Sequence, residues 1–283
     1  MSAIEDLIAE VSSGNTDAAT ALAAIIQKLE ELKTAIENIE IGGGSGSGSG
    51  DSPESALAGK FSVSASKQVQ FSKGNLVATI DAAGTPTAWK FAANQYDYLG
   101  EGGANKTIGT AAGDVDLFGW STVATTYGIS TSTSNGDYSG DFVDWGNNIG
   151  DGSTWRTLSK DEWVYLFETR TNASGLYKCE VTVCGKTNCV VIAPDGFTGT
   201  IETSYDATAW ATAETAGLVC LPAAGYRHGS NVYYVGDVGY YWSSTAGSSN
   251  DAYNVYFISN DVYPGLSDFR NRGSSVRLIT ESK

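Results

Sequence analysis

Apolar residues recur at alternating intervals of three and four near the N-terminus of the chain. The repeat consists of Leu22, Ile25, Leu29, Leu32, Ile36 and Ile39. This spacing is typical of a helical heptad seam, with these residues at positions a and d. Leu at a with Ile at d favours more than two strands. We therefore expect residues 1–40 to form a helical coiled-coil stalk that makes the protein a homotrimer. A single amphipathic docking helix is the alternative.

Beyond this segment the pattern changes to short runs of alternating apolar and polar residues. Residues 60–64 and 68–71 alternate in this way and predict strands. One clear helix is predicted over residues 159–170, because Ser159 and Glu162 have the spacing of a capping box. The apolar face of this helix consists of Trp163, Leu166 and Phe167.

Few other segments have helical periodicity. Glycine- and asparagine-rich sequence around residues 100–155 predicts long surface loops. These patterns predict an α+β domain with a mainly antiparallel, twisted sheet and few helices. We expect Trp163 and Trp242 to be buried, because aromatic side chains of that size in otherwise polar segments usually anchor a core.

A stretch of glycine and serine separates the two patterns. Residues 42–50 contain no other residue type. Such a sequence cannot bury apolar surface and behaves as a flexible tether. We therefore divide the chain into a helical segment over 1–40, a linker over 41–57 and a globular domain over 58–283.

Three of the four cysteines lie in a predicted β-hairpin. We expect its turn at residues 186–187, a register that sets Cys184 opposite Cys189 in a non-hydrogen-bonded pair. A cross-strand disulfide can form there under oxidising conditions. Buried free thiols are the default for these residues and for Cys179 and Cys220. Zinc fits poorly, because the sequence has no paired Cys-x-x-Cys with accompanying histidines.

The net charge of the chain argues against some classes of binding partner. The formal net charge is −15 and the pI is about 4.3, which argues against binding to nucleic acid or to anionic membranes. No apolar run approaches the roughly eighteen residues of a membrane span, so we expect no membrane insertion. The N-terminus lacks the basic and apolar regions of a secretory signal. We therefore expect assembly in a cytoplasm.

Residue usage changes sharply near the C-terminus. Residues 215–280 contain no Lys, Glu, Gln or Met, whereas residues 1–214 contain 10 Lys, 13 Glu, 4 Gln and 1 Met. About nine such residues would be expected in this window. Tyr, Asn, Asp, Ser, Phe, Arg and His predominate instead, as they do in binding surfaces. An Asn codon (A-A-pyrimidine) randomised at its adenines encodes none of the missing types and no Trp. The alternative is that β-rich sequence disfavours Lys and Glu anyway.

Five short runs carry a resemblance to a known family. They are Trp155–Trp163 (WRTLSKDEW), Leu221–Arg227 (LPAAGYR), Gly239–Thr245 (GYYWSST), Ala252–Phe257 (AYNVYF) and Ser275–Ile279 (SVRLI). The first is similar to a run in the formylglycine-generating-enzyme branch of the C-type lectin fold. The ordered set resembles the variable proteins of diversity-generating retroelements, over roughly residues 58–280. The heptad segment lies outside this resemblance.

The resemblance implies a C-type lectin-like ligand-binding domain with a variable region at about residues 226–275. In that family a reverse-transcriptase system mutates adenines in the coding segment, and the fold displays the varied side chains. The implied function is a receptor-binding adhesin on a phage tail fibre, placed in the virion after cytoplasmic assembly. Its partner would be a protein or glycan on a host or other cell surface. A protein of the bacterial cytoplasm, or a surface lectin, is the alternative.

If the substituted positions follow the family pattern, the ligand face consists of His228, Tyr233, Tyr234, Asp237, Tyr240, Asn250, Asp251, Tyr253, Tyr256, Asn260, Asp261, Tyr263, Asp268, Phe269 and Asn271. Alternation through residues 253–258 implies a strand with one outward and one packed face. By their motif positions, Arg227 and Arg277 are expected to make scaffold hydrogen bonds. By the same motif match, Tyr226, Tyr241 and Trp242 are expected to be scaffold residues of the core or of its rim. For Arg270 and Arg272, scaffold and ligand contact both stay open.

The sequence favours a binding protein over an enzyme. A formylglycine-type enzyme, the alternative, needs a cysteine pair in its C-terminal half, but Cys220 alone lies beyond residue 189. His228 is the only histidine and has no nucleophile motif around it. The Glu-Pro-Asn and Trp-Asn-Asp motifs of calcium-dependent lectins are missing. We therefore expect no catalytic residue, no metal and no cofactor. Ca²⁺ binding by the acidic residues at 137–151 through oxygen ligands is left open. A solvated acidic loop with Asx turns is favoured over it, because no ligand spacing repeats there.

Overall fold

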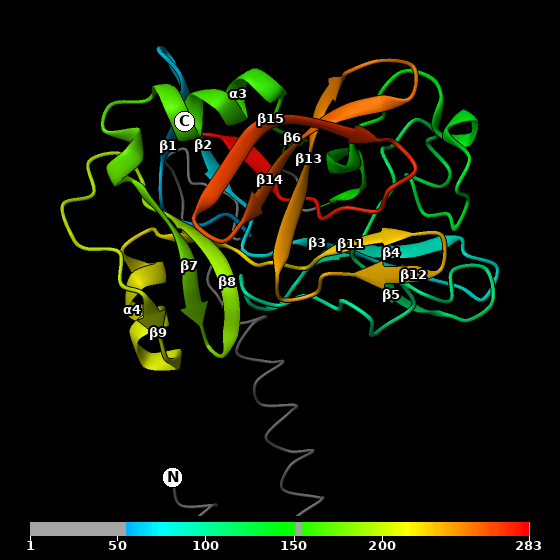
Figure 1. Ribbon diagram of the computed structural model, residues 1–283, viewed down its shortest axis with the longest axis horizontal. Coiled ribbons are helices and arrows are strands. Elements are labelled where there is room, and N and C mark those ends of the chain that lie inside the picture. Colours follow the sequence, from blue (N-terminus) through cyan, green and yellow to red (C-terminus); the bar gives the residue numbers. More distant parts are fainter. Residues whose placement is uncertain (1–54, 151–153, 283) are drawn as a thin grey trace, which may run out of the picture. The chain divides into compact units, whose positions relative to one another are not determined.

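The computed structural model describes residues 55–150 and 154–282 (Figure 1). The chain divides into two units, residues 1–50 and 51–283, and everything described belongs to the second. The predicted coiled-coil stalk, its trimeric association and the glycine–serine stretch lie outside the described residues.

Strands dominate the described chain. They are β1 (Phe61–Ser64), β2 (Lys67–Phe71), β3 (Leu76–Ile80), β4 (Pro86–Phe91), β5 (Gly113–Val115), β6 (Trp155–Thr157), β7 (Tyr177–Val183), β8 (Lys186–Ile192), β9 (Ser204–Tyr205), β10 (Val219–Leu221), β11 (Tyr226–His228), β12 (Asn231–Tyr233), β13 (Val238–Ala246), β14 (Asp251–Ile258), β15 (Asp261–Phe269) and β16 (Leu278–Glu281). The α-helices are α3 (Lys160–Val164) and α4 (Ala207–Thr215), and single helical turns occur at η1 (Asn135–Tyr138), η2 (Trp145–Asn148), η3 (Tyr165–Thr169) and η4 (Ala173–Gly175). The predicted α+β class with few helices is confirmed.

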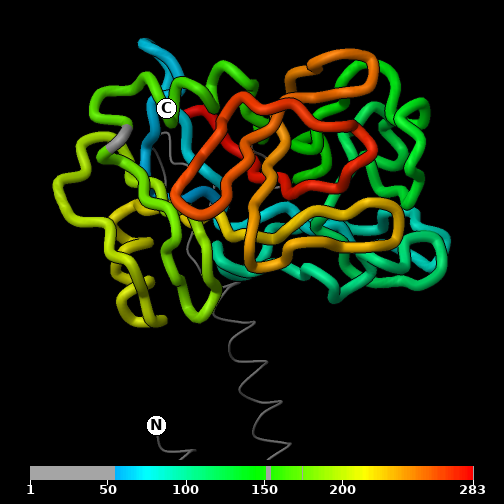
Figure 2. The backbone as a smooth tube through the Cα atoms, viewed as in Figure 1, coloured from blue at the N-terminus to red at the C-terminus, as the bar shows by residue number. Residues whose placement is uncertain are grey.

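The strands form several small sheets rather than one large one. Their orders are β1-β2-β16-β6, β10-β8-β7-β9, β4-β3-β5, β13-β14-β15 and β11-β12. Among these pairs only β7 with β9 is parallel, so the sheets are mainly antiparallel, as the sequence predicted. Strand β16 lies between β2 and β6, and Ile279 is opposite Phe71 on one side and Arg156 on the other. Figure 2 shows this C-terminal strand beside the N-terminal strands. The two ends of the described chain therefore close on each other.

Three clusters of buried side chains fill the domain. The first lies between α3, β1, β2 and the inner face of the β13-β14-β15 sheet, to which Val255 and Phe257 belong. The second is built around β3, β4 and several tryptophans, and it includes Trp242 and Ala252 from the other face of the same sheet. The third joins β7, β8 and β10 to α4. The β13-β14-β15 sheet is thus covered on both faces at one end and on one face only at the other.

The predicted helix at 159–170 forms and begins at the predicted residue. The Ser159 side chain accepts a hydrogen bond from the backbone N–H of Glu162, whose carboxylate in turn accepts one from the N–H of Ser159. After Val164 the chain widens into the π-turn η3 and ends where Arg170 N donates to Tyr165 O. The apolar face is buried as predicted, with Trp163, Leu166 and Phe167 in the first cluster.

The predicted register of the β7–β8 hairpin is wrong. The turn lies at Cys184 and Gly185, not at 186–187, and Cys189 is opposite Val181. Cys184 and Gly185 both have positive φ, 48° and 82°, the conformation that a tight hairpin turn requires. Bulges in β7 shift the pairing further. Cys184 therefore has no cross-strand cysteine, and the four cysteines are free thiols.

The predicted loop region at 100–155 is largely irregular, but it is not a surface loop throughout. Trp120 and Trp145 are buried within it. Their indole N–H groups donate to the backbone carbonyls of Ser243 and Tyr127. Trp242 is buried as predicted and donates to the carbonyl of Phe118 at 2.7 Å. The indoles of Trp120 and Trp242 thus link this long segment to β13, whereas that of Trp145 holds the segment to itself. The glycine and asparagine content did not predict these contacts.

Candidate functional site

The main exposed feature of the described surface is a group of tyrosine side chains in contact with one another. We call this group the tyrosine face; it consists of Tyr226, Tyr233, Tyr234, Tyr240, Tyr256 and Tyr263. Of the seven most exposed large apolar or aromatic side chains in the described chain, six lie between residues 233 and 269. Tyr233, Tyr234 and Tyr263 are 41%, 59% and 46% exposed. Concentrated exposure of this kind marks interaction surfaces in soluble proteins.

Strand register places three of these rings in one row. Tyr240 is opposite Tyr256, which is opposite Tyr263 across β13, β14 and β15. The ring centroids of Tyr240 and Tyr256 are 4.8 Å apart, and those of Tyr256 and Tyr263 are 5.8 Å apart. The next residue along each of the first two strands points inward, so that Tyr241 and Phe257 stack in the core. Strand alternation therefore separates display from packing.

The β11–β12 hairpin brings the other tyrosines to this row. Tyr226 lies at the junction, with ring centroids 5.4 Å from Tyr233, 6.1 Å from Tyr234 and 5.5 Å from Tyr240. Gly225 permits the close approach, since a side chain at this position, whose φ is +72°, would collide with the carbonyl of Tyr233. Six rings, from two sheets and the residue after β12, thus form one continuous aromatic surface.

One ion pair borders this surface. Arg272 donates to Asp268 at 2.9 Å, and its guanidinium carbon lies 4.9 Å from the ring centroid of Tyr226 and 5.9 Å from that of Phe269. Burial raises the pKa of Asp268, and the neighbouring guanidinium of Arg272 opposes that rise. Of the two arginines left open by the sequence, Arg272 belongs to the face.

The other three arginines of the C-terminal segment are buried scaffold. Arg277 donates to the carbonyls of Ser72, Gln95 and Cys220 at 2.6–3.0 Å. Arg227 donates to the carbonyls of Leu117, Ser130 and Gly229. Arg270 donates to those of Tyr138, Gly140, Ser248 and Asp251. The prediction for Arg227 and Arg277 is confirmed, and Arg270 joins them because its guanidinium also stacks on Trp120 at 4.2 Å.

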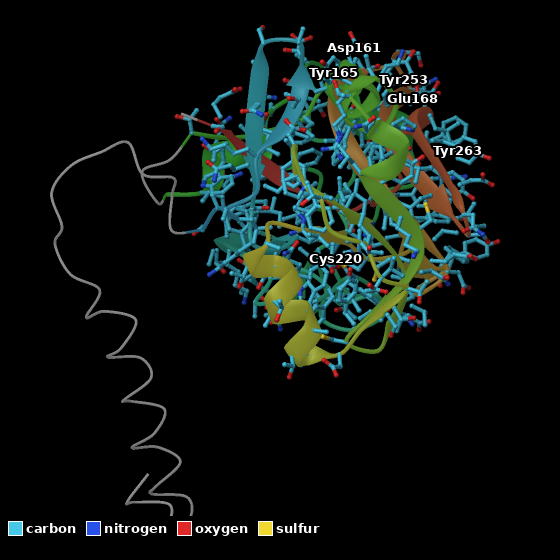
Figure 3. All side chains as sticks on the ribbon, turned by 90° about the vertical axis from the view of Figure 1, so that its left-hand side faces the viewer. Asp161, Tyr165, Glu168, Cys220, Tyr253 and Tyr263 are labelled. Atoms are coloured by element: carbon cyan, nitrogen blue, oxygen red, sulfur yellow. The ribbon has the colours of Figure 1, made fainter. Side chains whose placement is uncertain are left out.

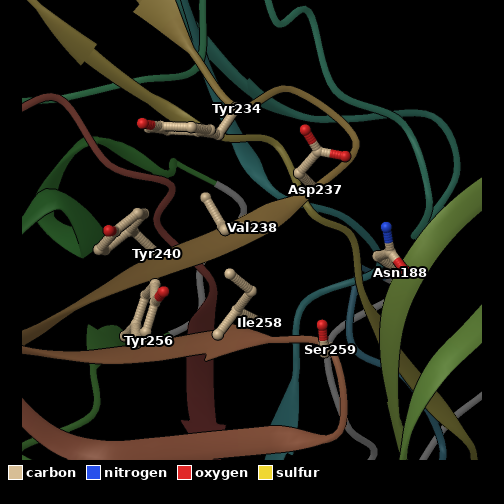
Figure 4. A pocket seen from close by; sticks show the side chains of 8 residues that line it. All are labelled: Asn188, Tyr234, Asp237, Val238, Tyr240, Tyr256, Ile258 and Ser259. Atoms are coloured by element: carbon tan, nitrogen blue, oxygen red, sulfur yellow. The ribbon is translucent and has the colours of Figure 1, made fainter.

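A groove of about 600 Å³ opens at one end of the tyrosine face (Figure 4). It is lined by Asn188, Tyr234, Asp237, Val238, Tyr240, Tyr256, Ile258 and Ser259. Burial raises the pKa of Tyr240 and of Tyr256, so both phenols stay neutral at physiological pH. The groove therefore offers aromatic faces and neutral hydroxyls, with Asp237 as the one ionisable carboxyl in its lining.

Most residues of the predicted ligand face are accessible. The side chains in exposed positions are His228, Tyr233, Tyr234, Asp237, Asn250, Asn260, Asp261, Tyr263 and Phe269. Those in half-buried positions are Tyr240, Asp251, Tyr253, Tyr256 and Asp268. Asn250 and Asp251 lie at the β13–β14 turn, whereas Asn260 and Asp261 lie at the β14–β15 turn. Asp237 and the predicted tyrosines other than Tyr253 are brought together, whereas the two turns lie at opposite ends of β14.

Two predicted site residues do not join this surface. Asn271 is only 5% exposed, and its amide donates to the carbonyl of Thr133 at 2.6 Å, so it holds a loop in place. Tyr253 is an odd number of residues from Tyr256 on the same strand and therefore lies on the opposite face. The ammonium of Lys160 on α3 lies 4.5 Å from its ring centroid. Figure 3 shows Tyr253 on the side of the domain where the labelled residues of α3 and η3 lie.

Sequence reasoning missed four residues of this surface. Tyr226 was taken as scaffold by its motif, yet it contacts three other rings of the face. Ile258 and Leu266 are 38% and 43% exposed, and Arg272 was left undecided. Ile258 could have been found by parity, because it is two residues after Tyr256 on β14. Nothing local in the sequence marks the other three.

The described residues contain no group of three or more His, Cys, Asp or Glu side chains that could hold a metal ion. In the acidic loop, Asp144 caps η2 by accepting from Gly146 N and also accepts from Thr157. Asp137 accepts from the hydroxyl of Ser132 at 2.6 Å. These two carboxylates therefore have structural partners. No helix in the described part of the chain is long and apolar enough to cross a membrane.

Comparison with known proteins gives one match. A family profile described as a domain of unknown function, DUF8237, matches residues 163–279, which is less than half of the chain. This range runs from within α3 to β16 and includes the whole tyrosine face. No curated protein and no solved structure matches the chain.

Proposed function

We propose that this protein is a ligand-binding adhesin whose binding surface is the tyrosine face. The observation that carries the proposal is the continuous set of six contacting tyrosine rings, three of them 41–59% exposed. Tyrosine supplies a large amphipathic contact area at a low cost in conformational entropy. Packing alone does not explain these rings, because the core beneath them is already filled by Tyr241, Val255 and Phe257.

We also propose that a retroelement diversifies this surface on a C-type lectin-like fold. The segment without Lys, Glu, Gln or Met runs from the last residue of α4 into β16 and contains the whole tyrosine face. Within it, framework and display are separated, since Arg227, Arg270 and Arg277 are buried while most of the aromatic and acidic residues are accessible. A framework of this kind tolerates change at the surface. Such a protein would serve at a phage tail fibre as a homotrimer that binds a surface protein or glycan, since several weak sites acting together give useful avidity.

One observation counts against the formylglycine-type enzyme. Cys220 is fully buried, and this burial raises the pKa of its thiol well above the usual value. A thiol in such surroundings is not readily ionised, and the thiolate is the nucleophilic form. We therefore propose a protein that binds without catalysing a reaction.

Two tyrosines of β14 provide a matched test. Tyr256 belongs to the tyrosine face, whereas Tyr253 lies on the same strand, is also half-buried and faces α3. Full-length protein, Tyr256→Ser and Tyr253→Ser would each be applied to a glycan array and to intact bacterial cells. We expect Tyr256→Ser to lose at least about tenfold in affinity, as for an interface hot spot, and Tyr253→Ser to bind normally. Equal binding by both variants would refute the site.

The coding DNA tests the origin of the diversity. The codons of the accessible tyrosine, aspartate and asparagine positions are expected to derive from A-A-pyrimidine triplets. A near-identical template copy and a reverse-transcriptase gene are expected nearby. A coding segment with neither of these would leave an adhesin without diversification.

A further inference from the structure

The groove at the end of the tyrosine face combines aromatic walls with one carboxylate. Tyr234, Tyr240 and Tyr256 present their rings to it, and Asp237 lies at its rim (Figure 4). Val238 and Ile258 form an apolar floor. A volume of about 600 Å³ lies within the range of small-molecule sites. The groove therefore suits a small group that is both partly apolar and attracted to π-electron density.

The backbone of Tyr234, one wall of the groove, is strained. Tyr234 has φ of 56°, in the left-handed region that a bulky residue rarely adopts. Asp237 N and Val238 N both donate to the carbonyl of Tyr234, at 3.1 and 3.2 Å, which fixes the turn. Strained residues that the surrounding structure holds in place cluster at binding sites. The turn therefore fixes the backbone from which the exposed Tyr234 side chain reaches the groove.

The charges of this region favour a cationic occupant. Residues 215–280 contain four aspartates and four arginines, and no lysine or glutamate. Three of the arginines are buried and donate to backbone carbonyls, so Arg272 is the one arginine that reaches the surface. The four aspartates, in contrast, are exposed or half-buried. The surface of this segment is therefore acidic.

The protein itself shows how its tyrosines hold cations. Arg272 lies over Tyr226, Lys160 over Tyr253, and Lys186 over Tyr98 with its ammonium 4.4 Å from the ring centroid. At Tyr226 a carboxylate, that of Asp268, also binds the cation. Within the described chain, no Lys or Arg lies over the three groove rings. Asp237 forms no ion pair with a described residue, and Lys186 lies over Tyr98, which is not one of the three groove rings.

We propose that this groove binds an organic ammonium group, either a quaternary head group of the choline type or the side chain of a lysine. The three rings attract the charge through their negative faces, which is effective within about 6 Å of a ring centroid. Asp237 supplies the balancing carboxylate, and the alkyl groups on nitrogen rest on Val238 and Ile258. This inference rests on the proposed function, because the groove is part of the same ligand face.

The test compares each cation with a neutral molecule of the same shape. Full-length protein would be titrated by NMR with choline and with 3,3-dimethylbutan-1-ol. A second pair would be N-acetyl-lysine methylamide and N-acetyl-norleucine methylamide. We expect the cation to bind at least about tenfold more tightly than its neutral counterpart in one pair or both. The pair that discriminates identifies the source of the ammonium. Equal binding of cation and neutral molecule in both pairs overturns the proposal.

Variants locate the effect. Asp237→Asn and Tyr234→Ser are expected to reduce the preference for the cation at least about fivefold, because each removes one attractive partner of the charge. Tyr253→Ser, outside the groove, serves as the control and is expected to keep the preference. Circular dichroism verifies that each variant is folded. A preference that survives both groove variants places the cation elsewhere and contradicts the assignment.

Failure of the ammonium site can be distinguished from failure of the proposed adhesin function. If Tyr256→Ser abolishes binding to cells or glycans while neither cation is preferred, the adhesin stands and the ammonium site is wrong. If Tyr256→Ser leaves surface binding unchanged, the adhesin itself is wrong at this face.

Discussion

The stability of the protein should respond very differently to the same substitution at Tyr241 and at Tyr263. Tyr241 is fully buried; its hydroxyl donates to the carbonyl of Pro222 at 3.0 Å and accepts from the amide of Asn75 at 3.2 Å. Its ring stacks on Phe257. Tyr263 is 46% exposed and makes one ring contact, with Tyr256.

The expected losses follow from these contacts. Tyr241→Ser leaves a large cavity, which costs about 3–5 kcal/mol for a buried aromatic residue. It also strands buried hydrogen-bonding partners, at about 1–3 kcal/mol more. Tyr263→Ser removes one half-exposed aromatic pair, worth about 0.5–1 kcal/mol. The free energies of unfolding should therefore fall by at least about 4 kcal/mol in one case and by about 1 kcal/mol or less in the other.

Thermal unfolding followed by circular dichroism measures the difference. For a domain of this size, 1 kcal/mol corresponds to a shift of about 2–4 °C in Tm. We expect Tyr263→Ser to melt within about 4 °C of the parent and Tyr241→Ser to melt at least about 8 °C lower or not to fold. Comparable losses in the two variants would show that the tyrosine face is part of the core, and the reasoning would fail.

Three further changes test the scaffold and the site. Arg277→Met removes the donor to three buried carbonyls and is expected to lower the free energy of unfolding by about 3–5 kcal/mol in urea titration; a loss under about 1 kcal/mol would contradict its scaffold role. Burial raises the pKa of Glu162, but hydrogen bonds led by those from Arg156 outweigh it and leave that pKa below its usual value. The stabilisation by Glu162 is thus complete above the unfolded-state pKa of about 4.3, and it is lost as the pH falls through the lower folded-state pKa. The Glu162→Gln variant should therefore lose less stability than the parent protein between about pH 5 and pH 3. Identical pH profiles would refute this. Tyr234→Gly relieves a left-handed backbone strain of about 1 kcal/mol, but it also removes the ring contact with Tyr226. These two effects oppose each other, so Tm should move by less than about 4 °C. A larger drop would show that the Tyr234 ring supports the fold.

Local rules of sequence predicted the local structure well. The spacing of Ser159 and Glu162 predicted the capping box, because both partners of a cap lie within one helical turn. Burial of Trp163 and Trp242 followed from their size and their polar surroundings. The scaffold role of Arg277 followed from its motif position, although the residue lies just before β16 and its three carbonyl partners come from distant segments.

Register and long-range contacts could not be read from the sequence. The β7–β8 turn was misplaced because bulges and left-handed residues such as Glu180, with φ of 52°, leave no clear sequence mark. Tyr253 was assigned to the ligand face by the family pattern of substituted positions, whereas the period of two along β14 puts it against α3. The burial of Asn271 depends on the loop at Thr133, more than a hundred residues away along the chain.

The most direct test of the tyrosine face combines folding and binding in one variant. Tyr233, Tyr234, Tyr256 and Tyr263 would be replaced together by serine in the full-length protein. Thermal melts would be recorded, and binding of parent and variant to intact bacterial cells and a glycan array would be compared. We predict a cooperative melt, because the core beneath is untouched, together with loss of binding. A variant that fails to fold, or one that folds and still binds like the parent, would contradict the claim that these tyrosines are the ligand surface.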